Sequence, residues 1–459
     1  MLVPQGMAYA YLAGMPPIYG LYAGLVPPVV YALLGTSRQL SVGPVAVSAL
    51  LVLAGVSQLA EPGTAAYVQL TITAGLLIGL LQFAMGILRA GKLSGLLSHP
   101  VLVGFTSAAA VIIAVSQLKD LLGIAIPASS HSYKTAYYAA THLGETSLLS
   151  VGFCLTAILL MLALKRVNKR LPAALLAVVI GTLLAWFFAL DKQGLAIIRE
   201  VPAGLPEAAI PVLDWPTVRR LLPTVVTVSV IGFIESISIA RVFDRRNGTR
   251  EVRPNRELHA IGLSKVAGAF FQALPSSGSF TRSAVNYTNG AKSALSNVFT
   301  AAVIGLTLLF LTELFYYLPK AILAAIILLA VRSLFDYKEA IHLWHTDRLD
   351  LLAMVATFVL TLGLGIETGV ACGALLSLGL LYLRPARPNK LRITRHGNTV
   401  RLDGPVYFLN IDHLRETLAE HRETAPLLQV DASGITGTDS SGAVALAEAL
   451  QPKTSLSPA

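Results

Sequence analysis

Long apolar stretches recur along this chain, and most approach the roughly 20 residues that a helix needs to cross a lipid bilayer. The clearest stretches are residues 67–88, 100–118, 147–164, 172–190, 222–240, 294–317, 319–334, 349–364 and 367–383. Shorter or more interrupted ones are residues 2–14, 19–34, 44–60, 258–273 and 279–290. Together they predict an α-helical polytopic membrane protein of fourteen segments, and apolar character falls sharply after Arg384.

The composition excludes a water-soluble globule. Only 13% of the residues are charged, whereas soluble domains carry about 25%. A net charge of +10 would be compatible with binding to nucleic acid. The positive residues, however, lie between the apolar segments, as they do in the cytoplasmic loops of membrane proteins. We therefore expect a lipid bilayer and no nucleic acid as partner. Cys154 and Cys372 lie in apolar runs and are expected to be small buried side chains.

The loop charges predict the orientation. One side of the membrane collects many more Lys and Arg residues than the other, and that side should be cytoplasmic. With an even number of segments both termini are then cytoplasmic, and we expect the protein in the inner (plasma) membrane of the cell. The alternative for the Arg-rich loop 241–256 is a specific binding role. The cations of this side are Arg89, Lys92, Lys165, Arg166, Lys169, Arg170, Arg241, Arg245, Arg246, Arg250, Arg253, Arg256, Arg384, Arg387, Lys390 and Arg392.

Two segments, 38–60 and 274–293, differ from ordinary membrane helices. Each begins with a Ser- and Gly-rich lead that is expected to be extended, and a helix start follows. Pro44 suits the first turn of the first helix. In the second, the plausible N-caps are Ser276, Ser277 and Ser279.

These two segments also match each other. Residues 41–50 align with 276–285 at Ser41/Ser276, Gly43/Gly278, Ser48/Ser283 and Ala49/Ala284. Each is third in a set of seven segments, and the two would run in opposite directions, which predicts a 7+7 inverted repeat. Two half-helices would then meet N-terminus to N-terminus near the bilayer centre. Their free N–H groups and positive dipole ends favour an anion.

Two charged residues inside membrane segments are candidates for function, whereas Glu313 and Glu367 lie near segment ends and are expected to be structural. Arg282 follows the start of the second half-helix; it is either an anion anchor or one member of a structural ion pair. Glu235 lies in the middle of segment 222–240, where burial disfavours the charged carboxylate. It is either the proton-coupling group or a neutralising partner for Arg282.

Four polar residues could complete such a site. Gln5 and Tyr9 lie four apart and share one helical face, although such residues are also common at membrane interfaces. Ser279 and Thr281 flank the start of the second half-helix. Their hydroxyls either donate to an oxyanion or cap the helix.

Two long motifs resemble a known family. The run PQGMAYAYLAGMPPIYGLYAGLVPPVVYALLGTSRQLSVGPVAV, residues 4–47, and the run SGSFTRSAVNYTNGAKS, residues 277–293, resemble the two signatures of the SulP sulfate permeases. The resemblance implies a uracil-permease-like fold in which a core of segments 1–4 and 8–11 moves against a gate of segments 5–7 and 12–14. It also implies a homodimer and an elevator-type mechanism.

The resemblance implies a substrate site as well. With Glu235 at this position the chain resembles the proton-coupled bacterial members of the family. The sodium-coupled bicarbonate members carry aspartate there. The substrate-binding positions carried over are Gln5, Tyr9, Val45, Ala46, Gly278, Ser279, Thr281 and Arg282.

The pattern changes after Pro388. Residues 391–410 alternate like strands, 411–423 indicate an amphipathic helix, and a buried strand and second helix follow. This region resembles the start of a STAS domain, which gives a transporter domain at 1–386, with segment 1 incomplete, and a partial cytoplasmic α/β STAS domain at 387–459. Related anti-sigma-factor antagonists are phosphorylated at a serine of the D-S-S-G turn. By that resemblance Ser441, ahead of Ser440, is the candidate regulatory site.

The sequence therefore predicts secondary active transport of small inorganic anions, sulfate foremost, by proton symport. The alternatives are bicarbonate, chloride or dicarboxylate transport on the same fold, a nucleobase symporter, an anion channel, and a sensor read out through the tail. No nucleophile triad, metal cluster or P-loop is recognisable in the sequence, so no enzyme activity, metal or cofactor is expected.

Overall fold

The computed structural model describes residues 1–91, 98–127, 132–168, 171–199, 204–249, 251–383, 391–396, 399–408 and 429–450, with single residues between 410 and 421. It divides into two compact units. The first unit comprises Met1–Ser94, Ala109–Phe335 and Gly365–Glu367, and the second comprises Gly95–Ala108, Asp336–Leu364 and Thr368–Ala459. The expected domain boundary at 386/387 and part of the expected helix 411–423 lie outside the described residues, as do Lys92, Lys169, Arg170, Arg250, Arg384, Arg387 and Lys390.

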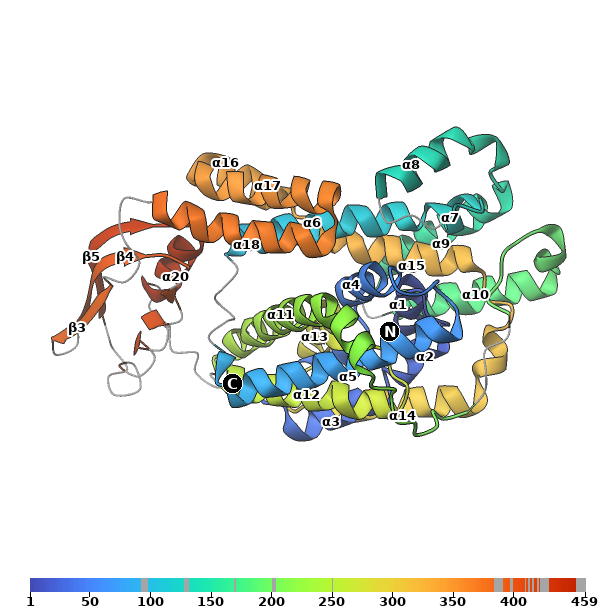
Figure 1. Ribbon diagram of the computed structural model, residues 1–459, viewed down its shortest axis with the longest axis horizontal. Coiled ribbons are helices and arrows are strands. Elements are labelled where there is room, and N and C mark those ends of the chain that lie inside the picture. Colours follow the sequence, from blue (N-terminus) through green and yellow to red (C-terminus); the bar gives the residue numbers. More distant parts are fainter. Residues whose placement is uncertain are drawn as a thin grey trace. The chain divides into compact units, whose positions relative to one another are not determined.

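The first unit is helical (Figure 1). Its α-helices are α1 Leu2–Leu12, α2 Ile18–Tyr22, α3 Val26–Leu34, α4 Ala46–Val56, α5 Ala65–Ile87, α7 Leu118–Leu122, α8 Ser132–Thr141, α9 Leu148–Val167, α10 Ala173–Phe187, α11 Trp215–Arg246, α12 Pro254–Phe270, α13 Phe280–Thr288, α14 Leu295–Phe310 and α15 Lys320–Val331. The helix α6 His99–Ser116 is shared between the units. Short 3-10 turns lie at Leu143–Glu145, Leu190–Gln193, Thr312–Phe315 and Arg332–Leu334.

Four described helical stretches are long and apolar enough to cross a membrane: Ala65–Ile87, His99–Leu122, Leu148–Val167 and Trp215–Asp244. Shorter apolar helices accompany them, among them α14. On α14 large apolar side chains stand exposed three or four residues apart, so they form one stripe along the helix. These side chains are Leu295, Phe299, Val303, Leu306 and Phe310. A continuous apolar stripe of this kind suits contact with lipid.

One helix is longer than its apolar stretch predicted. α11 runs from Trp215 to Arg246, through Pro223, whereas the apolar residues cover only 222–240. The Asp214 side chain caps the N-terminus of α11, because its Oδ2 accepts a hydrogen bond from the Thr217 N–H at 3.0 Å. The expected Arg-rich loop therefore begins later, and Arg241 lies on the helix. Hydropathy marks where a helix leaves the apolar region, not where its backbone hydrogen bonds end.

The core of the first unit rests on a close helix crossing. α12 packs along α5 and also contacts α3, and the three helices run side by side in Figure 1. Gly79 on α5 faces Gly262 on α12, and a Cβ added to either glycine would lie 2.8 Å from the other's carbonyl oxygen. Only glycine permits this approach, which is typical of membrane helix pairs.

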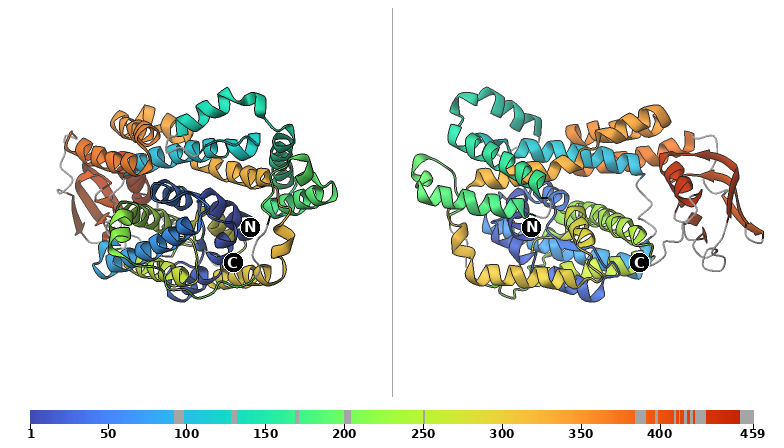
Figure 2. Two further views of the ribbon diagram at one scale, coloured as in Figure 1. Left: turned by 45° about the vertical axis from the view of Figure 1, so that its right-hand side comes forward. Right: turned by 180° about the vertical axis from the view of Figure 1, so that it is seen from behind.

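The second unit joins helices to a small α/β domain. Its helices are α16 Tyr337–Thr346, α17 Arg348–Leu364, α18 Ile366–Leu383 and α20 Ser440–Leu450, and its strands are β3 Arg392–His396, β4 Thr399–Val406 and β5 Gln429–Thr438. β4 is central, antiparallel to β3 and parallel to β5, and α20 packs against the sheet (Figure 2). Alternate residues Val400 and Leu402 are buried, as the strand pattern predicted.

Candidate functional site

Two helices of the first unit begin directly after short strands that pair with each other. β1 (Ser41–Gly43) precedes α4, β2 (Ser277–Ser279) precedes α13, and the strands are antiparallel, with Ser41 opposite Ser279 and Gly43 opposite Ser277. This confirms the expected extended leads and helix starts. The pairing brings the first turns of α4 and α13 together, where the backbone N–H groups have no partner within their own helix.

The details of these helix starts differ from expectation. α4 begins at Ala46 with Val45 as its extended N-cap, so Pro44 precedes the helix instead of occupying its first turn. Ser279 is the N-cap of α13, but its Oγ lies 3.2 Å from the Thr281 Oγ1. Among the described residues neither helix start has a side-chain cap. Their N–H groups are therefore available to another acceptor.

β1 is held on both edges by side chains. On its outer edge Asn297 of α14 donates from Nδ2 to the Leu40 carbonyl at 2.9 Å and accepts from the Val42 N–H at 3.2 Å. The Ser41 N–H donates to the Ser283 Oγ at 2.9 Å. The amide of Asn297 thus replaces a neighbouring strand and completes the hydrogen bonds of β1.

α11 holds β2. The Gly278 N–H donates to the Ser236 Oγ at 2.9 Å, and the Ser277 Oγ donates to the Gly232 carbonyl at 3.2 Å. Gly278 and Ser279 are therefore strand residues fixed between β1 and α11. Because Ser236 follows Glu235, the same contacts fix the backbone of Glu235 beside the strand pair.

Arg282 connects the two halves of the site. Its Nε donates to the Ser41 Oγ at 3.2 Å and its Nη1 to the Pro44 carbonyl at 2.9 Å. Only 5% of the residue is exposed, and its buried Nη2 has no hydrogen-bond partner in the part of the chain that the structure describes. A buried guanidinium with an unused donor indicates a place for an anionic acceptor.

Glu235 and Gln5 present further unpaired polar atoms. The buried Glu235 Oε2 and Gln5 Oε1 lack hydrogen-bond partners within the described ranges. Glu235 is within electrostatic range of Arg282, yet the ion pairs among described residues do not join the two. Buried unpaired groups are costly, and Glu235 and Arg282 lie within electrostatic range of each other, so these two residues point to a ligand.

The remaining predicted residues are placed as follows. Gln5 and Tyr9 lie on α1 and are buried, and Tyr9 is within electrostatic range of Arg282. Val45 and Ala46 are buried at the start of α4. Thr281 is exposed on α13. The structure thus brings most of the predicted set to the strand pair.

The two predicted regulatory serines lie in the second unit, at the start of α20. The Ser440 N–H donates to the Asp350 Oδ2 at 2.9 Å, and the Ser440 hydroxyl donates to the same oxygen. The Asp439 Oδ1 accepts from the Gly442 N–H at 2.6 Å, and the Ser441 Oγ accepts from the His99 N–H at 3.4 Å. Two carboxylates therefore already occupy this helix N-terminus.

Lys265 is a buried charged residue that the sequence analysis missed. It lies on α12, is 3% exposed, and donates from Nζ to the Gln82 Oε1 at 2.8 Å. A lysine inside the expected segment 258–273 was the signal that could have revealed it, because a charge at membrane depth is rarely without a role.

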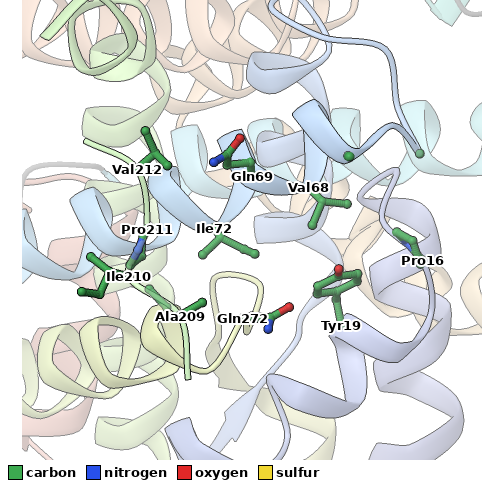
Figure 3. Close-up of a pocket in the computed structure, with 13 residues that line it drawn as sticks. Pro16, Tyr19, Val68, Gln69, Ile72, Ala209, Ile210, Pro211, Val212 and Gln272 are labelled. Carbon is green, nitrogen blue, oxygen red and sulfur yellow. The ribbon is translucent and has the colours of Figure 1, made fainter. Parts of the chain in front are cut away.

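A separate cavity of about 600 Å³ lies in the first unit (Figure 3). It is lined mainly by apolar residues of α5 and of the segment 209–212, and Tyr19, Gln69 and Gln272 add polar groups to the lining. None of the predicted site residues lines it. Within the described ranges no group of three or more His, Cys, Asp or Glu residues is arranged to hold a metal ion.

Residues 1–357 match the family model of the sulfate permease family, and residues 390–452 match the STAS domain. The chain belongs to the sulfate permease family. This confirms the resemblance carried by residues 4–47 and 277–293. As a member of this family the protein is a multi-pass membrane transporter of anions and not an enzyme.

Curated plant relatives that match the chain are named sulfate transporters. The chain is 37% identical over 98% of its length to "Sulfate transporter 4.1, chloroplastic" of Arabidopsis thaliana, of which it covers 71%. It is 36% identical over 92% of its length to "Probable sulfate transporter 4.2" of the same plant, of which it covers 66%.

Solved structures support the fold. The murine Solute Carrier 26 family member A9 anion transporter, in the inward-facing state, aligns with a TM-score of 0.79 at 25% identity, covering 98% of this chain and 81% of that one. The transmembrane domain of a cyanobacterial bicarbonate transporter, BicA, aligns with a TM-score of 0.70 at 24% identity, covering 82% and 94%. A helical transporter fold followed by a C-terminal α/β STAS domain is thereby shown.

Proposed function

We propose that this protein carries sulfate, or a closely related small oxyanion, across a membrane by secondary active transport. The observation that supports this most directly is the junction of α4 and α13. There two helix starts without a side-chain cap meet beside a buried guanidinium, whose Nη2 has no hydrogen-bond partner among the described residues. Relatives of which this chain covers about two thirds or more are named sulfate transporters.

The chemistry of the junction fits an oxyanion. Backbone N–H groups at a helix start carry partial positive charge, and a guanidinium offers donors in a planar fork. Val45, Ala46, Gly278, Ser279 and Arg282 would surround the anion, with Gln5 and Tyr9 of α1 closing one side. Thr281 would contribute its hydroxyl through a rotation of its side chain. Such a site disfavours cations, since the guanidinium and the two helix starts give it positive charge.

Glu235 is the proposed proton-coupling residue. A carboxylate beside an anion site repels the substrate when it is charged and tolerates the substrate when it is protonated. Its position next to Ser236, which holds β2, ties it to the strand pair. Binding of a proton to Glu235 would therefore favour anion binding, and release of the proton would favour release of the anion.

The proposal extends to the architecture. Fourteen membrane segments would form a 7+7 inverted repeat of the uracil-permease type, with the strand pair in a core that moves against a gate as an elevator. The protein would act as a homodimer in the inner membrane, with both termini in the cytoplasm. Ser441 would be the phosphorylated residue of the STAS region, because Ser440 donates its hydroxyl hydrogen to Asp350.

Uptake of radiolabelled sulfate into proteoliposomes, with and without an inward proton gradient, tests this proposal. We expect saturable uptake that the gradient accelerates and that excess unlabelled sulfate suppresses. Bicarbonate, chloride and fumarate should compete weakly. Sulfate entry that is linear with concentration would indicate a channel, and saturable entry of a competitor without sulfate would assign a different anion to the same site.

A further inference from the structure

Lys265 is a buried cation whose position is fixed by the crossing of α5 and α12. Gly79 and Gly262 meet at this crossing, and Gln82 and Lys265 each lie three residues later, about one helical turn along. The close approach of the two backbones brings the Lys265 Nζ to 2.8 Å from the Gln82 Oε1. One of the three N–H donors of the ammonium group is accounted for by this contact.

A short chain of contacts links Lys265 to the strand pair. The Gln82 Nε2 donates to the Ser229 carbonyl of α11 at 2.8 Å. On the same face of α11, a Cβ at Gly232 would lie 3.9 Å from the Gln82 Nε2 and 3.1 Å from the Ser277 Oγ of β2. Lys265 and Gln82 therefore form the layer of polar groups directly behind β2 and close to Glu235.

The charges of this region do not balance without a substrate. Arg282 and Lys265 are buried basic residues, and Glu235, half-buried with its Oε2 enclosed, is within electrostatic range of both. Neither cation has a carboxylate within 4 Å among the described residues. With Lys265 in its charged form and a proton on Glu235, the region carries two positive charges, which a divalent anion neutralises completely and a monovalent anion only by half.

We infer that Lys265 is a specificity-determining residue that makes the site select divalent over monovalent oxyanions. It acts on the bound anion through its charge across β2, without touching it. The inference rests on the proposed function and deepens it. A purely structural role, in which Lys265 only ties α12 to α5 through Gln82, predicts a change in stability without a change in selectivity.

The test compares sulfate uptake with nitrate uptake in proteoliposomes for four variants. K265M removes the charge and keeps a long unbranched side chain, whereas K265R keeps the charge. Q82E leaves Lys265 in place and gives it a carboxylate partner. S264A is the matched control on α12, because the buried Ser264 Oγ donates only to the Ile261 carbonyl of its own helix, at 2.8 Å, among the described residues.

We expect K265M and Q82E to lower the ratio of sulfate to nitrate uptake by about tenfold or more, since a lost unit charge at intermediate dielectric has an effect of this size. K265R and S264A should keep the wild-type ratio. An unchanged ratio in a K265M protein that still takes up sulfate would overturn the inference. If K265M does not fold, an unchanged ratio in Q82E overturns it equally. Wild-type protein without sulfate uptake would instead refute the proposed function, and the inference with it.

Discussion

Arg282 donates a hydrogen bond from Nη1 to the carbonyl oxygen of Pro44 at 2.9 Å, although 238 residues separate the two in the sequence. The bond joins the second half-helix to the end of the first strand. The Nε also donates to the Ser41 Oγ, whereas the Nη2 has no hydrogen-bond partner in the described part of the chain. Arg282 thus holds the junction together and, in the proposed function, also binds the anion, and its variants should separate these two roles.

Replacing Arg282 with alanine should lower sulfate uptake by about 100-fold or more, because charge-assisted hydrogen bonds contribute about 1.5–3 kcal/mol each. R282K keeps the positive charge but loses the planar fork, and an intermediate loss is expected. Uptake of labelled sulfate by purified, reconstituted protein measures both. Near-normal transport by R282A, at equal amounts of folded protein, would remove Arg282 from the site.

Glu235→Gln should separate anion movement from the proton gradient. The amide imitates the protonated carboxyl group, so the variant should still exchange internal for external sulfate but should no longer be accelerated by an inward proton gradient. Acidifying the outside should then leave its initial rate unchanged, whereas the wild-type rate should rise. A variant that responds to pH like the wild type would assign the proton to another group.

Asn297→Ala should loosen β1. The side chain satisfies both the Leu40 carbonyl and the Val42 N–H, and leaving a buried partner unsatisfied costs about 1–3 kcal/mol. We expect a lower unfolding temperature in detergent and weaker protection by sulfate. T300A is the control on the same helix, since the Thr300 Oγ1 donates to the Ser296 carbonyl. Equal effects of N297A and T300A would mean that Asn297 does not specifically support β1.

Ser440→Asp should destabilise the second unit, because it sets a carboxylate against the Asp350 oxygen that now accepts two hydrogen bonds. S441D should have a smaller effect, since the bond that the Ser441 Oγ accepts from the His99 N–H is long, at 3.4 Å. The unfolding temperature of the full chain measures the stability of both variants. Adding D350N should partly restore S440D, and a double variant no more stable than S440D would show that Asp350 is not its partner.

Single cysteines should report the orientation. In a chain with Cys154 and Cys372 replaced by alanine, G248C and G144C place a thiol where an added Cβ meets no atom within 4 Å. In whole cells an impermeant maleimide should label G144C from outside and G248C only after permeabilisation. The reverse pattern would invert the topology.

The sequence predicted the helices well because membrane helices are marked by apolar length, which needs no knowledge of partners. It also located the extended leads at the beginning of segments 38–60 and 274–293, because Ser and Gly before a helix start favour an extended backbone. It could not predict that Asn297 completes β1 or that Arg282 reaches Pro44, since those contacts join segments that are distant in the chain. Lys265 was missed for a related reason: its role depends on how closely Gly79 approaches Gly262.

The pairing of β1 with β2 has a thermodynamic consequence. Because the strands fasten the two helix starts to each other, and α11 and α14 fasten the strands, the anion-binding groups are expected to keep the same mutual distances whichever side of the membrane they face. A rigid site of this kind has equal intrinsic affinity on both sides. Such a carrier has no built-in direction, and with the proposed proton coupling its net flow would reverse whenever the combined anion and proton gradients reverse.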